Sequence, residues 1–272
     1  MEKEKTAIKI NLSDVVNKFL IHLKDLTDHV RFIYHAIDNT EIDIQKQLPT
    51  DSFPIMVNDK RIMPTIEQQK QLSINWVLNG AFEDIIKGLT ISFKEAYKYL
   101  EIHKLSQEAP YTKTNEELKM DLQKIEADME QLNFPDFINR MEILLKQTLP
   151  LKEEILSINR VRNCLVHRNG RVGKKDVDSA SLSGLQLKWI SLKFWTKINN
   201  QQTAITYDLR KDGITLDNIS YKVIKNEKSF QVNDKISLDI NQFNSIAYTC
   251  STFVQKLFAR LPRQDRVQKK SA

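Results

Sequence analysis

The chain has 272 residues, 41% of them hydrophobic and 28% charged, which is ordinary for a soluble globular protein with a sizeable core. Its formal net charge of +6 permits a polyanionic partner without demanding one. Two cysteines are too few for a disulfide framework or a zinc pattern. The first residues lack the apolar stretch of a signal peptide, and no segment reaches the roughly 18 consecutive apolar residues of a membrane span. We therefore expect a cytoplasmic protein with no membrane partner.

Helices dominate the pattern of apolar residues, and only 6 glycines and 7 prolines interrupt the chain. Apolar side chains that recur at steps of three and four residues predict helices over 12–38, 66–105, 115–132, 135–148, 151–168 and 240–260. The residues expected to begin them are Ser13, Thr65 with Gln68, Thr114 with Glu117, Pro135, Pro150, and Asp239 with Gln242. The expected fold class is therefore mainly α.

A change of composition separates the last helix from the others. From 185 to 238 the chain is rich in β-branched and aromatic residues, with turn candidates at Asn199-Asn200 and Asp212-Gly213, so we expect three to five strands of a small antiparallel sheet. The resulting interpretation is a single domain over 1–272. It consists of a helical body at about 12–168, this β insertion, a closing helix at about 240–260 and a disordered basic tail at 262–272.

Three histidines lie on the first expected helix. His22, His29 and His35 are seven and six residues apart, so they do not form the pair at a four-residue step that would hold a metal on adjacent turns. We interpret them as ordinary surface or half-buried residues and expect no metal and no cofactor.

The segment that indicates chemistry runs from Arg160 to Gly170, with the sequence RVRNCLVHRNG. Asn163 and His167 lie four residues apart, so the amide can orient the imidazole. The pair Asn169-Gly170 predicts the end of the helix, which places His167 in its last turn. A histidine there can give or take a proton near neutral pH. Arg162 lies about 140° around an ideal helix from His167, so the two converge only if the helix end is distorted or if two copies meet across a two-fold axis.

The run Arg162-Asn163-Cys164-Leu165-Val166-His167 resembles the R-x4-6-H signature of the HEPN superfamily, and the following Arg168-Asn169-Gly170 is similar to what trails that motif in many members. The resemblance covers the helical part, about 66–168 plus the closing helix, and implies a HEPN-like helical bundle. The first helix and the β insertion would be additions to that core.

The resemblance also implies a function, because many HEPN proteins are metal-independent endoribonucleases that work as dimers. In this chain it implies His167 as general base on the ribose 2′-OH or general acid on the leaving 5′-oxygen. It implies Arg162 as the group that stabilises the transition-state phosphate, and Asn163 as a residue that orients His167 or holds the phosphate. Expected partners are RNA, a second copy of the chain, and an antitoxin or regulatory protein. The biological role implied by family analogy is that of a toxin or antiphage (abortive infection) effector.

Basic residues around the motif fit a role in holding RNA. No acidic residue lies between Arg160 and Asp176, and the basic side chains of this stretch can contact phosphates. Besides Arg162 they are Arg160, Arg168, Arg171, Lys174 and Lys175. The alternative for this run is a solvated basic loop. Cys164, inside the helix, is interpreted as a core thiol rather than a nucleophile.

Two other functions remain open from the sequence. One is a non-catalytic HEPN module that mediates dimerisation or binds a nucleotide or a partner protein. The other is an unrelated helical interaction protein, in which Arg162 and His167 would stay far apart in any oligomer.

Overall fold

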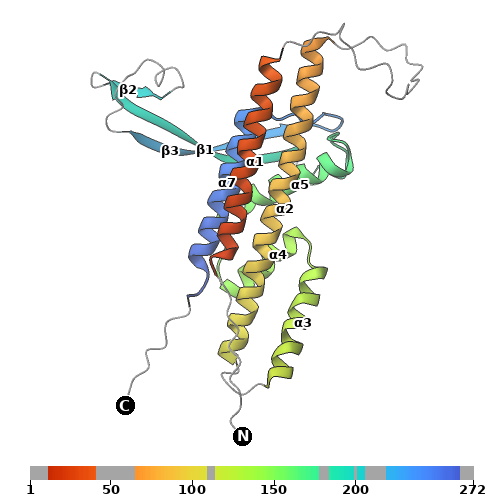
Figure 1. The fold of residues 1–272 in the computed structure, drawn as a ribbon, viewed down its shortest axis with the longest axis vertical. Coiled ribbons are helices and arrows are strands. Elements are labelled where there is room, and N and C mark those ends of the chain that lie inside the picture. The colour runs from red at the N-terminus through yellow and green to blue at the C-terminus, as the bar shows by residue number, and fades with distance from the viewer. Residues whose placement is uncertain are drawn as a thin grey trace, which may run out of the picture.

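A computed structural model describes residues 12–40, 65–108, 114–177, 184–198, 201–205 and 219–263 of the chain. They form a mainly helical protein with a small antiparallel sheet before the last helix (Figure 1). The helices are α1 (Asp14–Asn39), α2 (Ile66–Glu108), α3 (Asn115–Gln131), α4 (Phe134–Leu145), α5 (Lys152–His167) and α7 (Ile240–Arg260). Each expected helix is confirmed to within a few residues. None of the described helices is long and apolar enough to cross a membrane.

Three of the six predicted helix starts are confirmed by capping hydrogen bonds, whereas α5 begins two residues after Pro150, with no side-chain cap at Leu151. Reciprocal bonds of the capping-box type join Thr65 with Gln68, Thr114 with Glu117, and Asp239 with Gln242. The expected cap at Ser13 is wrong in one respect, because its side chain makes no capping hydrogen bond. A capping box of Asn133 with Asp136 begins α4, which was not foreseen, and Pro135 lies in the first turn as predicted.

The core is built around α2. Its buried face meets α1, α4, α5 and α7, and Figure 1 shows α1, α2 and α7 running side by side along the longest dimension. Phe93 of α2 lies at the centre, with ring centroids 4.9 Å from Phe134 of α4 and 5.5 Å from Phe253 of α7. Gly88 allows α1 to approach α2, because a Cβ there would lie 2.7 Å from the ring of His22. The α2 face therefore joins the bundle into one core.

The sheet has three strands in the order β2-β1-β3, both pairs antiparallel, which confirms the small antiparallel insertion. β1 (Leu185–Ile198) pairs along most of its length with β3 (Ser220–Phe230) and, at its far end, with β2 (Gln201–Ala204). Figure 1 shows the β2 end reaching away from the helices. The turn candidates at 199–200 and 212–213 lie outside the described residues. So does most of the expected tail, although the carbonyl of Pro262 accepts a hydrogen bond from the Tyr99 hydroxyl.

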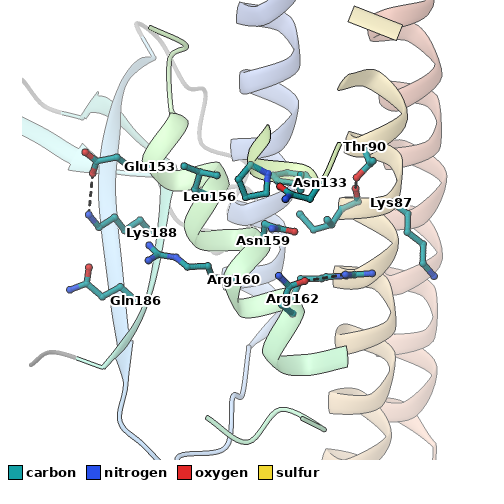
Figure 2. Close-up of a pocket in the computed structure, with 14 residues that line it drawn as sticks. Lys87, Thr90, Asn133, Glu153, Leu156, Asn159, Arg160, Arg162, Gln186 and Lys188 are labelled. Carbon is teal, nitrogen blue, oxygen red and sulfur yellow. Dashed lines mark hydrogen bonds and ion pairs between the residues drawn. The ribbon is translucent and has the colours of Figure 1, made fainter. Parts of the chain in front are cut away.

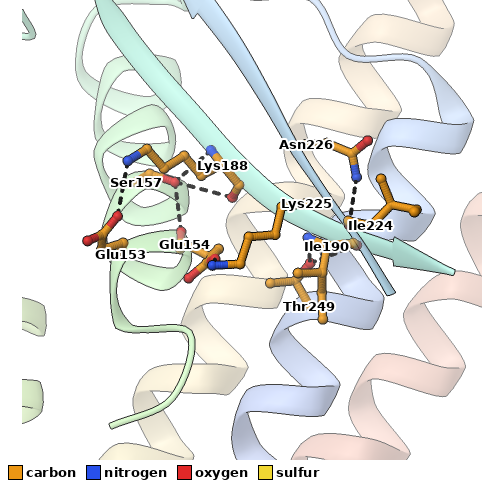
Figure 3. Close-up of polar contacts among 9 residues, drawn as sticks. All are labelled: Glu153, Glu154, Ser157, Lys188, Ile190, Ile224, Lys225, Asn226 and Thr249. Carbon is orange, nitrogen blue, oxygen red and sulfur yellow. Dashed lines mark hydrogen bonds and ion pairs between the residues drawn. The ribbon is translucent and has the colours of Figure 1, made fainter. Parts of the chain in front are cut away.

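Two helix hydroxyls bond to the part of the β1 edge where no strand of the described ranges pairs. Ser157 of α5 accepts a hydrogen bond from the Lys188 backbone N–H at 2.8 Å, and Thr249 of α7 accepts one from the Ile190 N–H at 3.0 Å (Figure 3). Both hydroxyl-bearing residues are fully buried. Because β2 begins to pair only at Trp195, these bonds satisfy backbone groups that none of the described strands reaches. The Ser157 bond fixes β1 against α5, and the Thr249 bond fixes it against α7.

Candidate functional site

A cavity of about 930 Å³ lies between α2, the start of α4, α5 and β1 (Figure 2). Its polar lining residues are Lys87, Thr90, Asn133, Glu153, Asn159, Arg160, Arg162, Asn163, Gln186 and Lys188, and its apolar ones are Ile86, Phe134, Pro135 and Leu156. Four lysines and arginines face one carboxylate in this lining. That carboxylate, Glu153, is paired with Lys188 at 3.1 Å, which holds the pKa of Glu153 below its usual value. The cavity is therefore suited to an anion.

Arg162 and Asn163 form one polar unit in the wall of this cavity. The Arg162 Nη1 donates to Asn163 Oδ1 at 3.1 Å, and Nη2 lies 3.8 Å from a carboxylate oxygen of Glu83 on α2. The Arg162 Nε is buried and has no hydrogen-bond acceptor among the described residues. The guanidinium is thus held from two sides while one of its donors is left without a partner.

His167 is placed as the sequence predicted, at the last residue of α5, but it does not reach the cavity. The helix ends where Asn169 and Gly170 adopt left-handed conformations with φ of 51° and 71°, and the Gly170 N–H returns to the Cys164 carbonyl at 3.1 Å. His167 is exposed and makes no hydrogen bond or ion pair within the described part of the chain. The expected bond from Asn163 to His167 is absent, because the Asn163 oxygen faces Arg162 instead. One chain therefore presents Arg162 and His167 on different sides of α5.

The segment after α5 is fastened to the segment before α7. Hydrogen bonds link Val172 N–H to the Asp234 carbonyl at 2.9 Å and Ile236 N–H to the Gly170 carbonyl at 2.8 Å. These bonds fix the direction in which the chain leaves the helix, and with it the position of His167.

The five predicted RNA-binding residues do not behave alike. Arg168 makes a bidentate ion pair with Asp176, whose side chain is only 3% exposed, so its guanidinium has a structural partner already. Arg171 is exposed and donates to the Asn233 carbonyl at 3.1 Å. Lys174 and Lys175 are exposed on the same loop.

The fifth of these residues, Arg160, is exposed and lines the cavity, on the β1 side in Figure 2. The structure brings it into the same lining as Arg162 and Asn163. It thus belongs with the cavity rather than with the loop.

Sequence reasoning missed Asn159, Lys87 and Lys188 as cavity residues. Asn159 lies three residues before Arg162 and four before Asn163, so the three share one face of α5. A polar residue between the buried Ile158 and the fully buried Val161 was the signal that could have found it. Lys87 and Lys188 come from elements distant in sequence, and no local pattern joins them to the motif.

Both cysteines, Cys164 and Cys250, are free and buried. Burial, with the negative charge of Asp176 nearby, raises the pKa of the Cys164 thiol, which fits the interpretation of a core thiol. In the described ranges, no group of three or more histidines, cysteines or carboxylates is gathered in a way that could hold a metal ion.

Comparison with protein-family models, with curated proteins and with solved structures found no match for this chain. The likeness to HEPN proteins is therefore carried by the motif alone.

Proposed function

We propose that the protein is a metal-independent endoribonuclease of the HEPN type that acts as a dimer, with Arg162 and His167 as its reacting groups. The observation that carries the proposal is the place of Arg162. Its guanidinium lies in the wall of a basic cavity, on the helix whose last residue is the exposed His167. RNA supplies both the phosphate that the cavity favours and the 2′-OH that a histidine can activate.

The proposed reaction is a transesterification within RNA. His167 of one copy removes the proton from the ribose 2′-OH, and the 2′-oxygen forms a bond to the adjacent phosphorus. The bond from phosphorus to the 5′-oxygen breaks, and that oxygen takes a proton from the second histidine or from water. The products are a 2′,3′-cyclic phosphate and a 5′-hydroxyl. Arg162 stabilises the extra negative charge on the phosphate oxygens, and Asn163 positions it through the 3.1 Å bond.

A second copy is needed because Arg162 and His167 diverge on one helix by about 140°. Across a two-fold axis, the arginine of one protomer can meet the histidine of its partner, and the same contact is repeated by symmetry. The two divergent faces of α5 thereby become one site at an interface.

Mixing two inactive variants tests this arrangement. Arg162→Ala and His167→Ala protomers, reassorted at equal amounts, give dimers of which about half are mixed. A mixed dimer holds one intact site of two, so the mixture should recover about a quarter of wild-type cleavage. If each chain used its own Arg162 and His167, the mixture would stay inactive, which would contradict the shared site.

The biological role that follows is that of a toxin or antiphage effector. Expression of the wild type should arrest growth while expression of His167→Ala should not. The second candidate function is a non-catalytic module that binds a nucleotide or partner protein, and it is favoured by one observation, the position of His167 outside the cavity lining. It predicts that His167→Ala keeps the full cellular effect.

A further inference from the structure

Asn159 is a largely buried polar residue in the wall of the cavity. Its residue is 6% exposed, and its side chain makes no hydrogen bond to any described residue although it lines the cavity. Figure 2 shows Asn159 and Arg162 extending from α5 toward α2. A buried polar group that lacks a partner destabilises a fold, and such groups are uncommon. The Arg162 Nε is such a group, and the Asn159 amide in the same lining makes no hydrogen bond to a described residue. Together they indicate that a ligand supplies hydrogen bonds here.

The chemistry of the lining indicates what kind of ligand fits. Ile86, Phe134, Pro135 and Leu156 provide an apolar surface of the kind on which a flat ring packs. An asparagine side chain offers an acceptor and two donors and can pair with the edge of a nucleobase. Arg160, Arg162 and Lys188 come from α5 and β1 and provide positive charge for a phosphate. This combination matches a nucleotide. Its base would pack on the apolar wall and pair with the amide, and its phosphate would meet the arginines.

We propose that this cavity is a subsite for one nucleotide, with Asn159 reading the base and Arg162 and Arg160 holding the phosphate. The nucleotide is either a residue of an RNA chain next to the cleaved bond or a free mononucleotide, and only the former rests on the proposed nuclease function. In both cases Asn159 determines which base is preferred.

Binding can be measured without cleavage in the His167→Ala background, because His167 lies outside the cavity lining. The probes are the four ribonucleoside 5′-monophosphates, single-stranded RNA hexamers of each base, and ribose 5-phosphate, titrated by calorimetry. We expect one base to bind about tenfold more tightly than ribose 5-phosphate, and Asn159→Ala to remove that difference. Preference among hexamers alone identifies RNA as the source, and preference among mononucleotides alone identifies the free nucleotide. Binding that ignores the base, or a base preference that survives Asn159→Ala, would overturn the proposal.

Two controls separate loss of binding from loss of fold. Asn244→Ala makes the same change at an exposed asparagine of α7, and it should leave both affinity and preference unchanged. Asn159→Leu keeps a side chain of similar size, and it should also remove the preference. Because the amide makes no bond to described residues, neither Asn159 variant should lower the thermal midpoint of unfolding.

The outcome distinguishes this subsite from the nuclease. Base preference that depends on Asn159, together with a wild type that does not cleave RNA, keeps the subsite and refutes the nuclease. RNA cleavage by a protein with no such preference keeps the nuclease and refutes the subsite.

Discussion

Removing the two hydroxyls that support β1 should destabilise the protein and loosen the cavity at once. Ser157→Ala leaves the Lys188 N–H without its 2.8 Å acceptor, and Thr249→Val leaves the Ile190 N–H without its 3.0 Å acceptor (Figure 3). Leaving a buried N–H without a partner costs about 1–3 kcal/mol, so we expect that loss in the free energy of unfolding from each variant. The double variant should lose about 2–6 kcal/mol, a large part of the 5–15 kcal/mol typical of a domain.

Urea denaturation at constant m-value measures this loss, and hydrogen exchange of the Lys188 and Ile190 amides locates it. Ser251→Ala is the matched control, because that hydroxyl accepts only a local bond from Gln255 at 3.2 Å, and it should change stability by less than about 0.5 kcal/mol. Since β1 carries Lys188 into the cavity lining, phosphate binding should weaken in the double variant as well. A double variant as stable as the control, with unchanged exchange at both amides, would refute the reasoning.

Three further predictions concern the charges of the molecule. Arg168→Ala should lower the free energy of unfolding by about 2 kcal/mol in urea denaturation, because it strips a bidentate partner from the nearly buried Asp176, and an unchanged midpoint would contradict the structural role. Lys174→Ala and Lys175→Ala should leave stability unchanged but each reduce the salt dependence of RNA binding by about 0.7 in slope, whereas a slope equal to wild type would place RNA elsewhere. Burial, reinforced by the charge of a nearby glutamate, raises the pKa of Tyr97 to about 12, so folding favours the neutral phenol. This contribution to stability is present below about pH 10 and is lost as the pH rises through 12. Tyr97→Phe should therefore unfold less readily than wild type in this pH range.

The helices could be predicted from the sequence because the patterns that indicate them involve residues close together along the chain. Capping pairs such as Thr114 with Glu117 and the stop at Gly170 depend on residues three or four positions apart, and the structure has them as predicted. The same local view also placed His167 correctly at the end of α5.

The cavity could not be predicted from the sequence, because its lining residues come from segments that are distant along the chain. Lys87 lies on α2 and Lys188 on β1, and only packing brings them to the face of α5 that carries Asn159. The ion pair of Arg168 with Asp176 shows a related limit. A run of basic residues predicts a phosphate-binding loop whether or not one of them is paired with a carboxylate eight residues further on.

Cleavage of single-stranded RNA by the purified protein in EDTA tests the central claim most directly, with wild type compared with His167→Ala. His29→Ala serves as the control, because it removes an exposed histidine of α1 away from the motif. The account predicts chelator-resistant cleavage that leaves 2′,3′-cyclic phosphate ends and spares DNA. It predicts that His29→Ala keeps this activity and that His167→Ala reduces it by about 10²–10⁴-fold. Cleavage that disappears with EDTA, or that His167→Ala retains in full, would contradict it.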